Sequence, residues 1–273
     1  MAFELPEAII VAEQMRKELG GKQIASIEMS PRCDSLIRQG FVSIQPEILP
    51  DSIIEDVYAS GKWIFLTLSN QYIFALALET KGYFLFSAPG LTPEECHVRL
   101  RFSDESILSE YIIGWGWAKL LTSTQIVESR FPGLIGISPL DIRFTYDLFN
   151  SFLRDAGHKP VRKVLTQQDL IGGIGGGYLQ DILFASHISP MRRTDEIADK
   201  VSRLLYESIK KVMEEALNAG GNNAERDLYG KPGTYMRRMG GHMKGRMCPE
   251  CGKTIVKAEI SGANLYMCPG CQK

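Results

Sequence analysis

The sequence predicts an α+β protein with an N-terminal helix, an antiparallel β-sandwich, a helical domain and a terminal zinc ribbon. Three observations support this fold class: helical periodicity before residue 20, strand-length apolar runs up to about residue 122, and helical periodicity again after residue 139. With 273 residues, 44% of them hydrophobic, the chain is long enough to bury two modest cores. We place the domains at residues 1–130, 131–240 and 241–273.

The N-terminal helix is expected over residues 6 to 19. Ile9, Ala12, Met15 and Leu19 recur at helical spacing and share one face, while a proline opens the first turn and two glycines follow the last. We therefore expect a helix that packs this apolar face against the β-rich domain.

Six strands are expected between Gln23 and Thr122, separated by short turns such as Ser69-Asn70 and Ser103-Asp104. Because the turns are short, consecutive strands should pair antiparallel. The expected strands are Trp63 to Leu68, Tyr72 to Leu78, Tyr83 to Phe86, Val98 to Phe102, Ser106 to Ile112 and Trp115 to Leu121.

Helical patterns dominate the second domain, and their apolar stripes are those of a packed core. Thr145 is placed to cap a helix that runs to about Arg154, and Thr194 to cap a longer helix that ends at Gly220-Gly221. Two shorter helices are expected between them, over residues 162–171 and 178–186.

Four cysteines near the end of the chain form two Cys-x-x-Cys pairs separated by sixteen residues. This spacing lets two turns place four thiolates around one ion, and four protein ligands leave no open position for catalysis. We therefore predict one structural zinc ion, with a redox dithiol as the alternative. The ligands are Cys248, Cys251, Cys268 and Cys271, and the segment between the pairs is expected to form a β-hairpin from Thr254 to Met267 that turns at Ser261 to Asn264.

The charge distribution separates the C-terminal region from the rest of the chain. The formal net charge is only −1, yet residues 222–273 hold nine Lys or Arg against four Asp or Glu. Within this region Lys244 and Arg246 belong to a stretch without acidic residues, which is typical of a phosphate-facing surface or of an ordinary solvated face. The chain has no long apolar span and no secretory leader, so we expect a cytoplasmic protein without membrane contact, associated with the nucleoid in a bacterium.

Five glycines within residues 172–177 separate two expected helices. Repeated positive φ angles are accessible mainly to glycine, so we expect a sharp turn here. The helix after it presents amide N–H groups and the positive end of its dipole, which together form a phosphate site. We predict phosphate contacts from Gly175, Gly176 and Tyr178; nucleotide binding or simple helix packing are the alternatives.

Three segments in the same order resemble the formamidopyrimidine-DNA glycosylase and endonuclease VIII family. They are Glu4-Leu5-Pro6-Glu7 before the first helix, Gly173 to Tyr178 followed by Ile188-Ser189-Pro190, and the cysteine pairs ending in Gln272-Lys273. The resemblance covers nearly the whole chain and implies a helix-two-turn-helix DNA-binding domain between the sandwich and the zinc ribbon. It implies damaged double-stranded DNA as the partner, bound by a monomer, and excision of oxidised bases with cleavage of the abasic strand.

The resemblance also implies three catalytic residues. The family uses its N-terminal amine as the nucleophile that forms a Schiff base at the sugar C1′, and an α-amine suits this because its pKa near 8 leaves a neutral fraction. After removal of Met1 this amine would be that of Ala2, one residue before the family position, which Phe3 occupies. Glu4 matches the acid/base glutamate, and Lys62 matches the lysine that contacts a phosphate beside the damaged nucleotide.

The sequence departs from the family at other contact positions. Gly176 replaces a phosphate-binding asparagine, and Ala263 replaces an arginine of the zinc hairpin. Trp115 and Trp117 follow the strand at a place where relatives carry residues that fill the gap left by an extruded base. We expect these tryptophans to be buried, with insertion into a base stack as the alternative.

Three functions are compatible with the sequence. The first is a DNA glycosylase with abasic-site lyase activity, and the second is a family member that binds damaged, crosslinked or distorted DNA with impaired catalysis. The third is an unrelated zinc-ribbon protein. Glu4 together with Lys62 favours the first, whereas the residues at positions 3, 176 and 263 favour the second.

Overall fold

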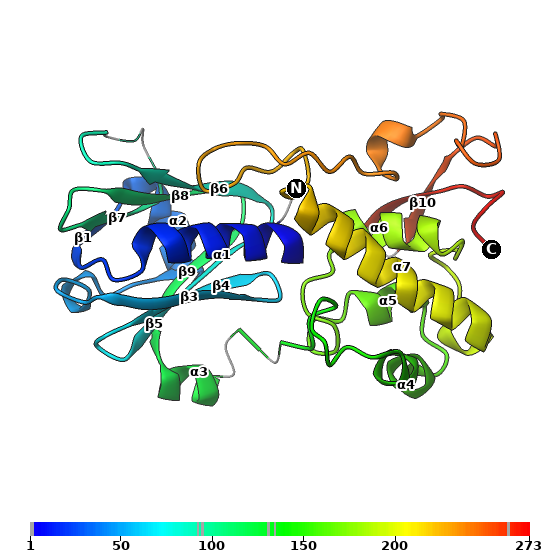
Figure 1. Cartoon of the computed structure of the whole chain (residues 1–273), viewed down its shortest axis with the longest axis horizontal. Coiled ribbons are helices and arrows are strands. Elements are labelled where there is room, and N and C mark those ends of the chain that lie inside the picture. Colours follow the sequence, from blue (N-terminus) through cyan, green and yellow to red (C-terminus); the bar gives the residue numbers. More distant parts are fainter. Residues whose placement is uncertain (1–2, 92, 94–95, 130–131, 134, 261–262) are drawn as a thin grey trace. The chain divides into compact units, whose positions relative to one another are not determined.

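The chain folds into two compact units, described in a computed structural model over residues 3–91, 93, 96–129, 132–133, 135–260 and 263–273 (Figure 1). The first unit comprises Met1–Leu134 together with Ala219–Thr234. The second comprises Ile135–Asn218 together with Tyr235–Lys273. The zinc ribbon therefore belongs to the same unit as the helices, and a segment after the longest helix returns to the first unit.

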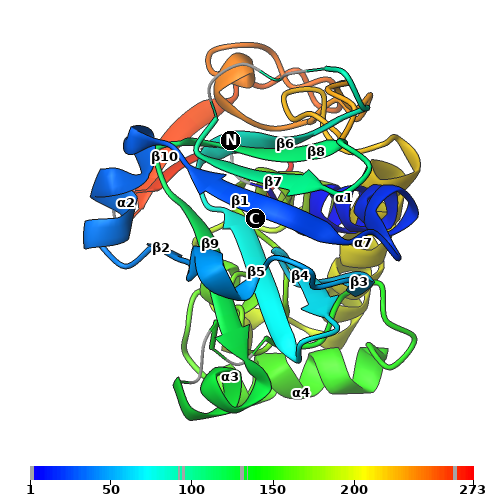
Figure 2. The ribbon, with the colours of Figure 1, turned by 90° about the vertical axis from the view of Figure 1, so that its left-hand side faces the viewer.

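The first unit is a helix on a sandwich of two sheets (Figure 2). Every strand pair is antiparallel except that of the two-residue strand β2, which runs parallel to β9. The four-stranded sheet has the order β1-β7-β8-β6 and the five-stranded sheet the order β2-β9-β5-β4-β3. The elements are α1 (Leu5–Leu19), β1 (Ile24–Met29), α2 (Asp34–Arg38), β2 (Val42–Ser43), β3 (Ile54–Ser60), β4 (Trp63–Leu68), β5 (Tyr72–Leu78), β6 (Lys81–Ser87), β7 (Val98–Phe102), β8 (Ile107–Ile113), β9 (Gly116–Thr122) and α3 (Ser123–Ser129).

The predicted antiparallel sandwich is confirmed, but the expected pairing of consecutive strands is only partly correct. Strands β3, β4 and β5 follow that order, as do β7 and β8. In contrast, β5 pairs with β9 and β6 pairs with β8, because the chain crosses from one sheet to the other at Glu79-Thr80. Strands β1, β2 and β3 lie outside the six expected runs.

Helix α1 closes one side of the sandwich core. Ala12, Met15 and Leu19 are buried as predicted, whereas Ile9 is only half-buried and Val11 takes its place on the inner face. This face belongs to the same core as the inward side chains of both sheets, among them Phe84 and Leu66. The apolar periodicity therefore identified the buried side of the helix to within one turn.

Residues 219–234 fold back onto the first unit. The N–H of Asn222 donates to Glu7 Oε1 at 3.0 Å, and the N–H of Phe86 donates to the carbonyl of Leu228 at 2.9 Å. Leu228 is fully buried in the sandwich core. The sequence alone had placed this segment with the helical domain, because no local pattern shows which core receives Leu228.

The second unit contains four α-helices within the described residues: α4 (Tyr146–Ala156), α5 (Val161–Leu165), α6 (Gly176–Ala185) and α7 (Asp199–Asn218). Thr145 caps α4 as predicted, since its hydroxyl accepts the N–H of Leu148. The predicted cap at Thr194 is wrong. Its hydroxyl donates instead to the carbonyls of Gly157 and Lys159. Thr194 begins a short 3-10 turn, and α7 starts five residues later.

The glycine turn is also less strained than its composition suggested. Of its five glycines only Gly173 has a positive φ, +97°. Gly175 is extended and precedes α6, and Gly176 is already the first helical residue, two positions before the expected start. The number of glycines therefore predicted more residues with a left-handed backbone than this turn contains.

Candidate active site and zinc ribbon

The N-terminal end of the first unit is anchored by Phe3. Its side chain is 1% exposed and packs edge-on against Phe84, with ring centroids 5.8 Å apart. Its backbone N–H donates to the carbonyl of Leu78 at 3.2 Å. The nitrogen of residue 3 is therefore an engaged amide, and the predicted nucleophile, Ala2, lies outside the described residues.

Glu4 begins helix α1 as its N-cap. Its backbone N–H donates to Glu7 Oε2 at 3.1 Å in a capping box, and only 5% of the residue is exposed. Helix N-caps and buried carboxylates are compatible, because the helix dipole stabilises negative charge at this end. Glu4 thus directly follows Phe3, whose backbone N–H is bonded to the carbonyl of Leu78.

Lys62 lies in the turn between β3 and β4, after Gly61, whose φ is +57°. Its ammonium forms an ion pair with Glu79, with Nζ 3.2 Å from Oε2. The two side chains are 18% and 35% exposed, so the pair is partly shielded from solvent. Glu79 was missed in the sequence, because a carboxylate after a strand carries no signal that it will face a lysine 17 residues earlier.

The loop that carries Glu79 is tied to the loop after β8. The N–H groups of Glu79 and Thr80 donate to the carbonyl of Trp115, and the hydroxyl of Thr80 donates to the carbonyl of Ile113 at 2.8 Å. The Trp115 ring is 57% exposed and contacts Phe41, which corrects the expectation that it is buried. Trp117 is half-buried against Phe41 and Trp63.

A pocket of about 370 Å³ opens beside these loops within the first unit. It is lined by the start of β6 (residues 81–83), by Ile113 and by residues 224–226 of the returning segment. The guanidinium of Arg226 lies 5.0 Å from the centre of the Tyr83 ring, and Tyr83 stacks on Tyr111. The lining of the pocket therefore combines one aromatic residue, Tyr83, with the cationic residues Lys81 and Arg226 and with Glu225.

In the second unit, the start of helix α6 lies at the glycine turn. Gly176 is exposed, and a side chain added there would meet no atom within 4 Å. The N-cap residue is Gly175, which has no side chain that could cap the helix. Tyr178 is 1% exposed and contacts Tyr235, so of this residue only the backbone remains a candidate for phosphate contact.

Two buried side chains of α6 connect the glycine turn to the C-terminal segments. Gln180 donates to the carbonyl of Gly176 at 2.9 Å and accepts the N–H of Tyr266 in the zinc hairpin at 2.9 Å. Asp181 accepts bonds from the Tyr235 hydroxyl and from the N–H groups of Arg238 and Met239. Burial raises the pKa of Asp181, although these donors oppose the shift.

Lys244 and Arg246 are both exposed, between the segment that Asp181 holds and the zinc ribbon. Arg238 is different, because it forms an ion pair with Glu215 at 2.7 Å. Lys244 and Arg246 are thus two of the exposed cationic side chains of this stretch.

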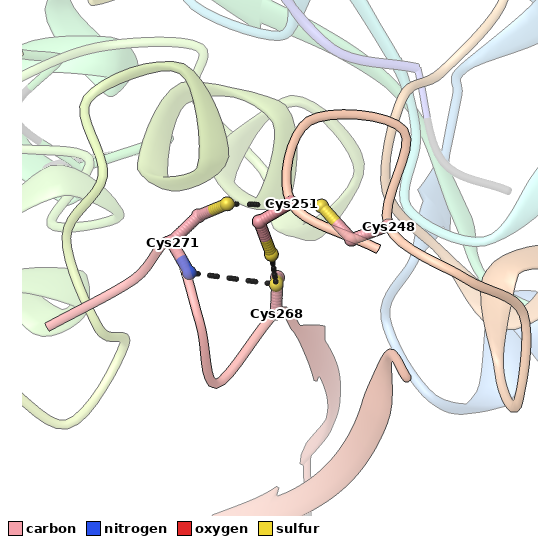
Figure 3. Close-up of side chains that lie close together, drawn as sticks. All are labelled: Cys248, Cys251, Cys268 and Cys271. Carbon is pink, nitrogen blue, oxygen red and sulfur yellow. Dashed lines mark hydrogen bonds between the residues drawn. The ribbon is translucent and has the colours of Figure 1, made fainter. Parts of the chain in front are cut away.

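The four C-terminal cysteines converge as predicted (Figure 3). Their sulfur atoms all lie within 4.8 Å of one another; Cys248 and Cys271 are 3.7 Å apart, and Cys251 and Cys268 are 3.3 Å apart. A tetrahedral zinc ion with bonds of 2.3 Å requires sulfur separations of about 3.8 Å. The cluster therefore fits the metal, and it holds one structural zinc ion.

The backbone around the cluster is shaped for these thiolates. A side chain at Gly270 would lie 2.7 Å from Cys251 Sγ, so only glycine permits this approach. Burial opposes ionisation of Cys268, but the N–H of Cys271 and the Cys251 thiol outweigh it and lower the pKa of Cys268 to about 7. The hairpin strands are β10 (Val256–Ile260) and β11 (Ala263–Met267); the predicted turn residues Ser261 and Gly262 lie outside the described residues.

The chain thus combines a helix-capped β-sandwich with a helical unit that carries a four-cysteine zinc ribbon, which is the architecture of a two-unit zinc protein. Three sequence profiles then identify the family. The formamidopyrimidine-DNA glycosylase N-terminal domain matches residues 3–111, the H2TH domain of the same glycosylase matches 135–227, and the zinc finger found in FPG and IleRS matches 247–273. The chain belongs to the formamidopyrimidine-DNA glycosylase family.

Individual relatives agree over their full length. The chain is 26% identical to a formamidopyrimidine-DNA glycosylase of Lactococcus lactis subsp. cremoris, with 99% of both chains covered. It is 28% identical to one from an Exiguobacterium species, again over 99% of each. Among solved structures, a complex of Lactococcus lactis Fpg with DNA that contains an abasic site has a TM-score of 0.84 at 24% identity, covering 99% of both chains.

No helix among the described residues has both the length and the apolar character needed to cross a bilayer.

Proposed function

We propose that this protein is a base-excision DNA glycosylase that removes damaged bases from duplex DNA and then cleaves the abasic strand. The observation that carries the proposal is that two adjacent residues at the end of β5 contact the two segments to which we assign the catalytic groups. The carbonyl of Leu78 fixes the N–H of Phe3, which directly precedes Glu4, and the carboxylate of Glu79 holds Lys62. Relatives named formamidopyrimidine-DNA glycosylases and complexes of such proteins with abasic-site DNA support this function.

In this reaction the amine of Ala2 attacks the sugar C1′. The new C–N bond forms as the bond to the base breaks, and the base leaves protonated. Opening of the sugar ring, whose oxygen takes up the proton that the amine loses, gives the Schiff base. Glu4 is assigned to these proton transfers, and Lys62 to the phosphate beside the damaged nucleotide and to ring opening. Elimination at the sugar then cleaves the strand.

The position of the amine is the demanding part of this assignment. Because the Phe3 nitrogen is engaged with Leu78, the amine of residue 2 starts up to about 3.5 Å further along the chain. Productive attack tolerates a misplacement of only about 1 Å. The assignment of the amine of Ala2 as nucleophile is therefore the step that the trapping experiment below tests directly.

The remaining groups are assigned to DNA binding. Gly175 and Gly176 present the start of helix α6 to one phosphate, with the backbone of Tyr178 behind them, and Lys244 and Arg246 contact others. The pocket lined by residues 81–83 and 224–226 is assigned to the extruded base, since its volume suits a ligand of this size. We propose that the protein acts as a monomer in the cytoplasm, on the nucleoid in a bacterium.

Trapping with borohydride tests the chemistry. The protein is incubated with a duplex that contains one abasic site, the Schiff base is reduced, and the adduct is detected on a denaturing gel. We expect an adduct that peptide mass analysis assigns to residue 2, a lower yield for E4Q, and release of oxidised bases from damaged duplexes. Retarded migration of damaged duplex without adduct or base release would instead indicate a binding protein that has lost catalysis.

A further inference from the structure

The ion pair between Lys62 and Glu79 differs from the other pairs of the first unit in its position and shielding. Glu79 is 35% exposed, whereas the carboxylates of the described pairs Arg16–Asp56, Lys22–Asp104 and Arg99–Glu28 are 53%, 49% and 56% exposed, and Lys62 itself is 18% exposed. Coulomb attraction is screened less in such a setting, so the Lys62 ammonium is held more firmly than a surface lysine.

The backbone fixes both partners of this pair. Lys62 follows Gly61, whose positive φ makes the tight turn between β3 and β4, and the N–H of Glu79 is bonded to the carbonyl of Trp115 at 3.0 Å. The carboxylate is therefore a built feature of the site. It lies one residue after Leu78, which fixes Phe3.

A lysine paired with a carboxylate forms a neutral ion pair, which as a whole does not attract a polyanion. Binding to any DNA phosphate releases counterions in proportion to the number of free cations that meet phosphates. While paired with Glu79, Lys62 cannot add to this number, and a phosphate that approaches it also meets the negative charge of Glu79.

We infer that Glu79 is a positioning residue for Lys62. Glu79 holds the Lys62 ammonium at the end of β5 and keeps it from the phosphates of undamaged duplex. Lys62 exchanges Glu79 for a phosphate when a damaged nucleotide enters the site. The second part of this inference rests on the proposed glycosylase function, whereas the first concerns DNA binding alone.

The experiment compares E79Q with E55Q, K62M and the double variant K62M/E79Q. Glu55 lies exposed on β3, so E55Q makes the same change of charge away from Lys62. Affinity for an undamaged duplex is measured over a range of salt concentrations, and single-turnover base excision is measured on a damaged duplex.

Four results are expected. E79Q should bind undamaged duplex more tightly at low salt, with a slope of log K against log salt that is steeper by about 0.9, the increment for one more lysine that meets a phosphate. E55Q should leave the slope unchanged, and E79Q should have no effect in the K62M background. Excision by E79Q should slow by roughly ten- to hundredfold, because the Lys62 ammonium is no longer held in place.

An equal salt slope for E79Q and the native protein would overturn the inference, as would an equal effect of E79Q with and without Lys62. If the native protein releases no base from any damaged duplex, the proposed function fails, while the salt slopes still decide the role of Glu79.

Discussion

Replacement of Glu110 by methionine is expected to stabilise the first unit. Glu110 lies on β8 opposite Val98 and Phe84, between the core residues Leu108 and Ile112. It is 3% exposed, and within the described part of the chain neither carboxylate oxygen has a hydrogen-bond partner. Burial alone raises its pKa well above the ordinary value of 4.5.

The magnitude follows from the cost of a buried polar group without a partner, about 1–3 kcal/mol. Methionine has similar length and fills irregular gaps in a core, so E110M removes this cost without leaving a large cavity. The free energy of unfolding should rise by about 1–3 kcal/mol at pH 7, and Tm by roughly 2–4 °C for each kcal/mol.

The gain must depend on pH with a defined sign. Because the pKa of Glu110 is higher in the folded than in the unfolded state, the folded state binds more protons between the two values, and stability falls as pH rises above about 4.5. E110M should therefore gain most at neutral pH and least near pH 5. The assay is urea unfolding at several pH values, with E55M on the exposed side of β3 as the control. An unchanged or lower stability of E110M at pH 7 would refute the reasoning.

Three further predictions concern the second unit. Asparagine in place of Gly176 should fit, because no atom lies within 4 Å of an added Cβ. It should strengthen duplex binding several-fold in titrations, since it adds an amide donor at the start of α6. Weaker binding would place the phosphate elsewhere. Alanine in place of Lys244 or Arg246 should flatten the salt slope by about 0.9 each, and an unchanged slope would remove that side chain from the interface. Alanine in place of Gly270 should lower zinc content measured by metal analysis, because its Cβ would lie 2.7 Å from Cys251 Sγ; full zinc occupancy would show that the loop can yield.

Several parts of this protein were determined by local sequence and could be predicted without a structure. The bounds of β4, β5 and β7 match the expected runs residue for residue. The four cysteines carry their geometry in their spacing, because a two-residue gap suffices to place two sulfurs on one ion. The N-terminal helix and the cap at Thr145 are likewise set by neighbours within four residues.

Other features depended on pairs of residues that are distant in sequence, and only the tertiary structure decided them. Periodicity shows that a strand buries one face but not which strand lies beside it, so the pairing of β5 with β9 was not predicted. The same holds for Leu228 in the sandwich core and for Glu79 beside Lys62. Glu110 is the clearest case, because a glutamate in a strand is expected to face solvent, and only packing of both sheets places this one inside.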